Sequence, residues 1–206
     1  MHASSWNVEE GAYEAGIVTQ DEIEIRSRAD LRAWLAEHQD RDGSVWLVFW
    51  KKHTDHYVPF VDFVEECLCW GWVDSVTRGV DGDRSSVRIS PRKVTSAWSA
   101  VNKDLVAKAR ASGAMTAFGE AKIDAGVANG MWSFLDDVER LEVPSDLRAA
   151  LADRDAGPAW EAYPRSVKRG SLEWIKTAKT DRTRAARIAE VSGSAAEGQR
   201  PKPFRR

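Results

Sequence analysis

The residues best suited to chemistry lie between positions 67 and 102, where tryptophans stand among charged and hydroxyl side chains. A tryptophan ring offers a large apolar face and one N–H donor, and cations stack on that face, so rings beside ionisable groups suit the wall of a binding pocket. The competing interpretation places each ring in the core between a sheet and a helix. The stretch predicts a ligand site formed by Trp72, Asp74, Arg78, Arg92, Lys93, Ser96, Trp98, Ser99 and Asn102.

The chemistry expected at this site is the binding of an anion. Arg92 and Lys93 follow Pro91 and lead into a predicted helix. Two cations beside the free N–H groups of a helix N-terminus can hold phosphate or carboxylate. The alternative is structural: Arg92 and Asp74 form an ion pair between strand and helix, and hydroxyls such as that of Ser96 only cap the helix.

Two histidines and two cysteines suggest a zinc site, but their spacing argues against it. His53-x-x-His56 and Cys67-x-Cys69 together supply the ligand types of structural zinc. Such sites usually hold paired cysteines about two to four residues apart in a turn. Positions 67 and 69 instead fall in a predicted helix, where they diverge by about 200°. We therefore expect no metal site.

No catalytic residue is predicted either. A nucleophilic Cys69 would need a nearby base and an electropositive, partly exposed setting, and no local signature supplies them. The sequence also lacks the motifs of P-loop and dinucleotide binding, of serine hydrolases and of zinc metalloproteases. We expect no cofactor, and a binding protein is favoured over an unrecognised enzyme acting at the same pocket.

Several separated strings, in order, resemble one known family: CLCWGWVDS, SPRKVTSAWSAVN, ASGAMTAFGEAKIDAG with GMW, and YPRSVKRGSLEWIKTAKTDRTRAARI. From about Glu22 onward the chain resembles the YdeI/OmpD-associated family, also called the bacteriocin-protection family. The resemblance implies a small bacterial cytosolic protein associated with tolerance of envelope-active peptides and related stress. The family commonly has Phe where this chain has Trp70, and a long last helix where this chain has SGSAAEG at 192–198.

Composition fits a cytoplasmic protein. The chain has 206 residues, of which 43% are apolar and 30% charged. It holds no apolar run long enough to span a membrane, and its first twenty residues carry acids where a signal peptide carries Lys or Arg. A disulfide between Cys67 and Cys69 would be strained, which favours reduced thiols in a cytosol.

The charge is unevenly distributed along the chain. Residues 165–206 hold twelve Lys and Arg and four Asp and Glu, a net charge of +8, and the remaining residues carry −10. A small anion or a protein partner is the first expectation, and nucleic acid is the alternative partner. For that alternative the candidate residues are Arg165, Lys168, Arg169, Trp174, Lys176, Lys179, Arg182, Arg184 and Arg187.

The elements that position these residues indicate an α+β protein. Strands are predicted at Glu22–Ile25, Val45–Trp50, Val73–Val80 and Ser86–Ser90, with Val45–Trp50 in mid-sheet. Helices are predicted after the cap Ser27, from Pro59 to a glycine cap at Gly71, over Ala97–Ala111 behind Thr95 and Ser96, and over Thr116–Asn129. The turn Asp81-Gly82-Asp83 should join two strands through a glycine with positive φ.

The domain map has four parts. Residues 1–21 form a flexible leader, and 22–133 form an α+β body whose small antiparallel or mixed sheet packs with helices. Residues 134–143 resemble a loop, 144–191 form a C-terminal helical module, and 192–206 form a flexible basic tail. Within the module, helices are predicted at Leu147–Leu151, Ala159–Tyr163, Val167–Ala178 and Arg182–Val191.

Overall fold

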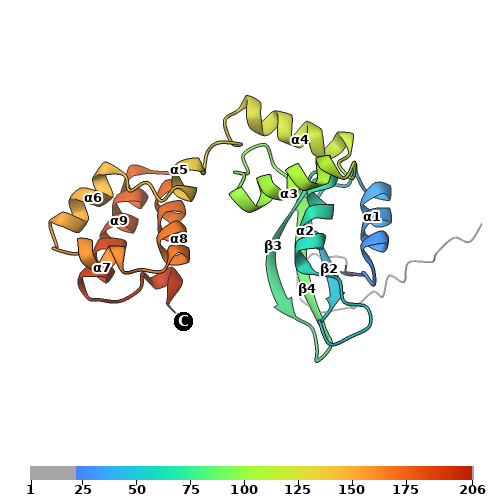
Figure 1. Ribbon diagram of the computed structural model, residues 1–206, viewed down its shortest axis with the longest axis horizontal. Helices are drawn as coiled ribbons and strands as arrows, with labels where there is room; N and C mark the ends of the chain where they lie inside the picture. The colour runs from blue at the N-terminus through green and yellow to red at the C-terminus, as the bar shows by residue number, and fades with distance from the viewer. Residues whose placement is uncertain (1–21, 206) are drawn as a thin grey trace, which may run out of the picture. The chain divides into compact units, whose positions relative to one another are not determined.

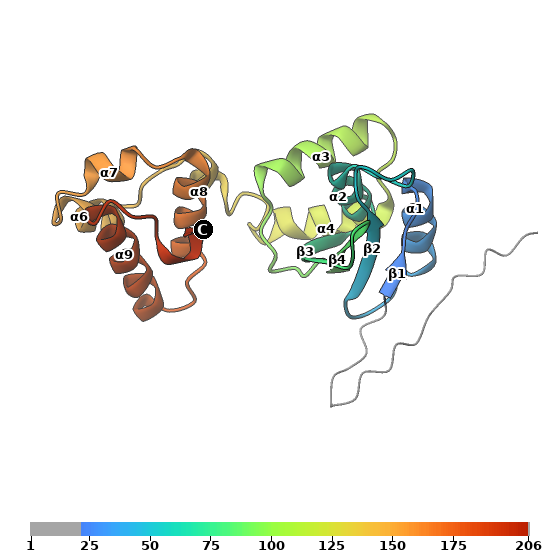
Figure 2. The same cartoon turned by 90° about the horizontal axis from the view of Figure 1, so that it is seen from below.

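The computed structural model describes residues 22–205, which form two compact units that divide between Ser133 and Phe134 (Figures 1 and 2). The N-terminal unit combines a sheet with helices, and the C-terminal unit is helical. The α+β prediction is thus confirmed. The predicted leader, residues 1–21, lies outside the described residues.

The sheet of the N-terminal unit is mixed. Its strands are β1 (Glu22–Glu24), β2 (Val45–Trp50), β3 (Trp72–Gly79) and β4 (Arg84–Pro91), in the spatial order β1-β2-β4-β3. β1 runs parallel to β2, whereas β2–β4 and β3–β4 are antiparallel pairs. The uninterrupted apolar run of β2 therefore lies in mid-sheet, as its composition predicts.

Four helices complete this unit: α1 (Arg28–Glu37), α2 (Phe60–Cys69), α3 (Ala100–Ala111) and α4 (Ala117–Ala128). α1 and α2 lie against one face of the sheet, and α3 and α4 pack on α2 (Figure 1). Leu31, Leu47, Phe63 and Ile89 form part of the core between sheet and helices. The other face of the sheet is called the outer face below.

The hairpin turn forms where it was predicted, but by a different mechanism. Gly82 does not have positive φ, so that part of the prediction is wrong. Instead the Asp81 carboxylate accepts hydrogen bonds from the backbone N–H groups of Asp83 (2.9 Å) and Arg84 (2.7 Å). An aspartate turn of this kind closes the loop without a left-handed residue.

Helix α3 begins later than the sequence suggested. Its N-cap is Ser99, whose Oγ accepts from the N–H of Asn102, and not Thr95 or Ser96. Trp98 consequently precedes the helix. Both candidate caps are hydroxyl residues, and the choice of Ser99 follows from tertiary contacts: Trp98 N–H donates to Met131 O, which fixes the chain just before the cap.

The C-terminal unit contains α5 (Asp136–Glu139), α6 (Ser145–Ala152), α7 (Gly157–Glu161), α8 (Arg165–Lys176), α9 (Asp181–Ala196) and the 3-10 turn η1 (Lys202–Phe204). α5 occupies part of the segment 134–143 that resembled a loop. Leu147, Trp160, Leu172, Ile175 and Val191 are buried in the core of this unit.

The predicted end of the last helix at Val191 is wrong, because α9 continues to Ala196. Ser192, Ser194 and Ala195 are buried, so the small residues of SGSAAEG allow close packing and do not break the helix. The following segment is also anchored: the Phe204 ring packs against Gly170, and Lys202 N–H donates to Glu190 Oε1 (3.0 Å). These contacts argue against the flexible tail expected for residues 192–206.

Candidate functional site

The nine predicted ligand residues fall into three different surroundings. Trp72 is 1% exposed and lies in the core between sheet and helices. Its ring meets Trp34 edge-on, with 5.6 Å between the ring centroids. For Trp72 the core interpretation therefore holds, and its placement in a pocket wall is a correction.

Arg78 lies on the outer face of the sheet, away from the other candidates. Asp74 pairs with Ile89 and Thr77 with Val87, so β3 has one extra residue between these pairs, a β-bulge. The bulge reverses the alternation of side chains, and it places Arg78 opposite Ser86. There Arg78 Nε donates to Ser86 Oγ (3.1 Å) and its guanidinium forms an ion pair with Glu22.

Asp74, Arg92 and Trp98 form the part of the prediction that assembles. Arg92 directly follows β4 and is only 3% exposed. Its guanidinium lies 3.6 Å from the centroid of the Trp98 ring, and Nη2 donates to Ala97 O (2.5 Å). Trp98 is itself held from the other side by α4, because its Nε1 lies only 2.6 Å from where a Cβ on Gly126 would stand.

The charge of Arg92 is incompletely compensated. Its buried Nε and Nη1 have no hydrogen-bond partner, and no carboxylate of residues 22–205 forms an ion pair with it. Burial lowers the pKa of Arg92 to about 10, although the charge of Asp74 opposes this change. Burial also raises the pKa of Asp74, against a backbone hydrogen bond and the charge of Arg92. The expected Arg92–Asp74 ion pair is thus replaced by a longer-range attraction.

The remaining candidates follow Arg92 along the chain. Lys93 is exposed, and Ser96 is half-buried. The hydroxyl of Ser99 caps α3. Asn102 lies in the first turn of α3, and because Trp98 precedes that helix, the two residues do not share a helix face as predicted. None of these four residues hydrogen-bonds to the guanidinium of Arg92.

A second charged cluster was missed by the sequence analysis. Glu65 and Glu66 on α2 are almost fully buried and bind cations from two other helices. Arg28 pairs with Glu65 (2.9 Å) and Glu66 (2.8 Å), Arg32 with Glu66 (2.5 Å), and Lys108 with Glu65 (2.5 Å). The sequence did contain a sign of this cluster, because Glu65 and Glu66 are adjacent acids within a largely apolar helix. Because these acids and cations form ion pairs with one another, the cluster has a structural role: it holds α1 and α3 against α2.

The cysteines are unsuited to nucleophilic attack. Cys67 and Cys69 are free and buried. Burial raises the pKa of Cys69 to about 11 and that of Cys67 further, so both remain thiols at neutral pH. The histidines lie elsewhere: exposed His53 contacts Asp83 (3.0 Å), and His56 meets the edge of Trp50. Among residues 22–205 no group of three or more possible metal ligands gathers.

Most cations proposed for nucleic acid already bind partners within the C-terminal unit. Arg169 pairs with Glu139 and Glu173, Lys176 with Asp137, Arg184 with Asp146, and Lys168 with Glu161. Arg165 donates to Glu139 O, and Arg187 donates to Trp174 O and lies over the Trp174 ring. Lys179 and Arg182 are exposed, and their side chains make no hydrogen bond or ion pair with residues 22–205.

Comparison with known families divides the chain in the same way as the fold. Residues 140–198 match the family described as bacteriocin-protection, YdeI or OmpD-associated. Residues 23–122, including the strings around Trp72 and Trp98, match a different model, a domain of unknown function (DUF8412). No curated protein and no solved structure gives a significant match. Among residues 22–205, no helix combines the length and apolar character needed to cross a membrane.

Proposed function

Since residues 140–198 form a domain of the bacteriocin-protection, YdeI or OmpD-associated type, we propose that this chain is a cytoplasmic binding protein of stress tolerance. It acts by binding and not by catalysis. Its N-terminal unit binds a small oxyanion, such as a carboxylate or a phosphate, beside Trp98. The buried thiols of Cys67 and Cys69 are compatible with a reducing compartment.

One observation carries the proposal of an anion site. Arg92 Nε and Nη1 are buried without a partner, and buried polar groups are nearly always hydrogen-bonded. An oxyanion accepting from either nitrogen would supply the missing partner through a charge-assisted hydrogen bond. Trp98 fixes the plane of the guanidinium, so these N–H groups are held in position before a ligand arrives.

Asp74 gives the proposed site a pH dependence. Its carboxylate repels an anion bound to Arg92, and burial raises its pKa above the ordinary aspartate value. As pH falls through this raised pKa, Asp74 becomes neutral and the repulsion disappears. Anion affinity should therefore rise towards acid pH. In Asp74→Asn the affinity at neutral pH should be about tenfold higher, equivalent to about one pKa unit of interaction, and independent of pH over this range.

The test is a titration with sulfate, whose charge stays constant over this pH range, observed through the NMR signal of the Arg92 Nε–H group. We expect a saturable shift in the wild type and tighter binding in Asp74→Asn. Arg92→Lys lacks this Nε–H group, so its titration is followed through the fluorescence of the tryptophans, measured for the wild type as well, and should show no saturable change. Arg88→Gln is the matched control, since Arg88 lies on β4 four residues before Arg92 and its Nε donates to Ser44 Oγ. Acetate and phosphate titrations at fixed pH then distinguish the two oxyanion classes.

Two results would contradict the anion site. One is an Arg92 signal that sulfate leaves unchanged at any concentration up to about physiological ionic strength. The other is a shift of equal size in Arg88→Gln, Asp74→Asn and the wild type, which indicates general ionic screening. Ordered water would then be the partner of the Arg92 guanidinium.

Nucleic-acid binding through the basic helices receives less support. Residues 134–206 contain fifteen basic and twelve acidic residues, so the +8 of residues 165–206 falls to +3 for the unit. Phosphate contacts would have to displace existing ion pairs. A salt-dependent retardation of DNA or RNA that is lost in Lys179→Gln with Arg182→Gln would restore this alternative.

A further inference from the structure

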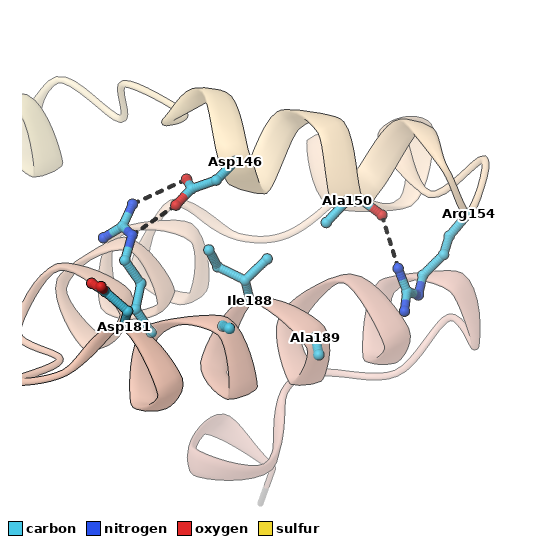
Figure 3. A pocket seen from close by; sticks show the side chains of 8 residues that line it. Asp146, Ala150, Arg154, Asp181, Ile188 and Ala189 are labelled. Atoms are coloured by element: carbon cyan, nitrogen blue, oxygen red, sulfur yellow. Dashed lines mark hydrogen bonds and ion pairs between the residues drawn. The ribbon is translucent and has the colours of Figure 1, made fainter.

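A hollow of about 580 Å³ lies between α6 and α9 in the C-terminal unit (Figure 3). Asp146, Ala150 and Arg154 line one wall, and Asp181, Ala185 and Ala189 line the other. Asp181, Ala185 and Ala189 are four apart on one face of α9, and Asp146 and Ala150 are four apart on one face of α6, with Arg154 in the turn that follows α6. The hollow is therefore a trough along two helices, with alanine at the middle of both walls.

The trough has an apolar floor. Ile188 points from α9 towards α6 and closes the space beneath the alanines (Figure 3). Its side chain is buried, whereas Ala185 and Ala189 are exposed. The small side chains leave the space empty, and the floor offers no polar group that could orient a small molecule.

The two ends of the trough carry opposite charge. At one end Arg184 binds Asp146 through two hydrogen bonds of 2.7 and 3.0 Å, and these charges cancel. Asp181, at the same end, forms no ion pair with residues 22–205 and leaves a net negative charge there. Arg154 lies at the opposite end, where its side chain forms one hydrogen bond with residues 22–205, a long one of 3.4 Å from Nη1 to Ala150 O.

We propose that this trough docks an amphipathic helix of a protein partner. A helix satisfies its own backbone hydrogen bonds, so it can lie on the apolar floor of the trough without leaving polar groups unpaired. Its side-chain ridge would enter the space between α6 and α9, as ridges enter grooves in ordinary helix packing. The occupant needs an apolar stripe with one acidic residue near Arg154 and one basic residue near Asp181.

The spacing of those two charges follows from helix geometry. Asp181 and Ala189, at the two ends of the wall formed by α9, are eight positions apart, which corresponds to about 12 Å along the helix, and Arg154 lies at the end marked by Ala189 (Figure 3). The partner should therefore carry its acid and its base about seven or eight residues apart on the face that bears the apolar stripe. Either order of the two charges is compatible, because the partner helix can lie in either direction.

The test uses a panel of designed helical peptides with the same apolar stripe and full-length protein, measured by fluorescence anisotropy. The peptides carry Glu and Lys two turns apart in both orders, or Lys at both positions, or Glu at both. We expect the wild type to prefer one of the mixed peptides. Ala185→Gln, which fills the trough, should weaken this binding at least tenfold.

The chain supplies a matched control at the next position. Ala186 is exposed on the same helix and does not line the trough, so Ala186→Gln should leave peptide binding unchanged. Both substitutions introduce a good helix former at an exposed site, so neither should impair folding. Arg154→Glu should shift the preference from the mixed peptide to the peptide with Lys at both positions.

Three outcomes would overturn the proposal: no peptide of the panel binds the wild type, Ala185→Gln and Ala186→Gln behave alike, or Arg154→Glu leaves the charge preference unchanged. Arg92→Lys should not affect peptide binding, because Arg92 belongs to the other unit. The trough and the anion site can therefore fail independently.

Discussion

At the scale of single residues, the acids of α2 show how charge is tolerated in the interior. Glu66 is 1% exposed, yet it accepts from Arg28 Nε at 2.8 Å and from Arg32 Nη1 at 2.5 Å. Arg32 also donates to Ala114 O, so one carboxylate organises two cations and a loop. A buried ion is stable only when its partners are this complete.

Replacing Glu66 with Gln should cost about 3 kcal/mol of folding free energy, the low end for breaking a buried pair. The low end applies because Arg28 and Arg32 are each more than one third exposed and keep access to water. Urea unfolding of the variant measures the loss. Glu120→Gln, which breaks the exposed pair with Arg110, is the control and should cost no more than about 1 kcal/mol. Equal losses for the two variants would show that burial does not strengthen the Glu66 cluster.

At the scale of elements, close helix approach depends on glycine in α4. A Cβ on Gly119 would lie 2.5 Å from Cys69 O and 2.7 Å from Leu68 O, the last carbonyl groups of α2. Backbone atoms at such distances cannot move aside as a flexible side chain can. The helices α2 and α4 therefore meet through backbone contact.

Gly119→Ala should destabilise the protein by about 2–3 kcal/mol, as overpacking of a close contact does. Gly193→Ala is the matched comparison: Gly193 lies inside α9, a Cβ there would meet nothing within 4 Å, and the change should stabilise by about 1 kcal/mol. Thermal unfolding measures both changes, and the melting temperature should fall in Gly119→Ala and rise in Gly193→Ala. A stabilised Gly119→Ala would mean that helix propensity outweighs the contact with α2.

Local signals in the sequence predicted most elements, and tertiary contacts decided the exceptions. The cap Ser27 and the left-handed Gly71 were identified correctly, because each acts through its own neighbours. The start of α3 at Ser99 and the extension of α9 through Ser192 depend on packing with distant segments, which a local pattern does not contain. The site shows the same division. The sequence predicted that Arg92 and Trp98 come together, but it did not reveal the bulge that places Arg78 on the outer face.

At the scale of the whole molecule, each unit has its own buried core, with Leu31, Leu47 and Ile89 in the first and Leu147, Leu172 and Ile175 in the second. The basic helices bind acids of their own unit, so part of the uneven charge of the chain is compensated inside that unit. The units should therefore be energetically independent.

A fragment of residues 134–206 should fold alone and unfold cooperatively at the same temperature as the corresponding transition of the full chain, as measured by calorimetry and circular dichroism. Limited proteolysis should first cut near Asn129–Ser133, where Asn129, Gly130 and Ser133 are exposed and no helix or strand is present. A fragment that lacks a cooperative transition would show that the C-terminal unit depends on the rest of the chain.

The bulge in β3 also determines which changes in chain length this protein can accept. Residues 75 and 76 together lie opposite position 88 of β4, so loss of one of them would restore regular alternation and leave Thr77 opposite Val87 and Arg78 opposite Ser86. β4 pairs with β2 without any such extra residue, so loss of one residue from the middle of β4 would turn the side chains that follow to the opposite face. Selection should therefore accept a single deletion at the bulge of β3 more readily than one in β4, and in an alignment of related chains a gap of one residue at 75 or 76 would leave the faces of the following side chains unchanged.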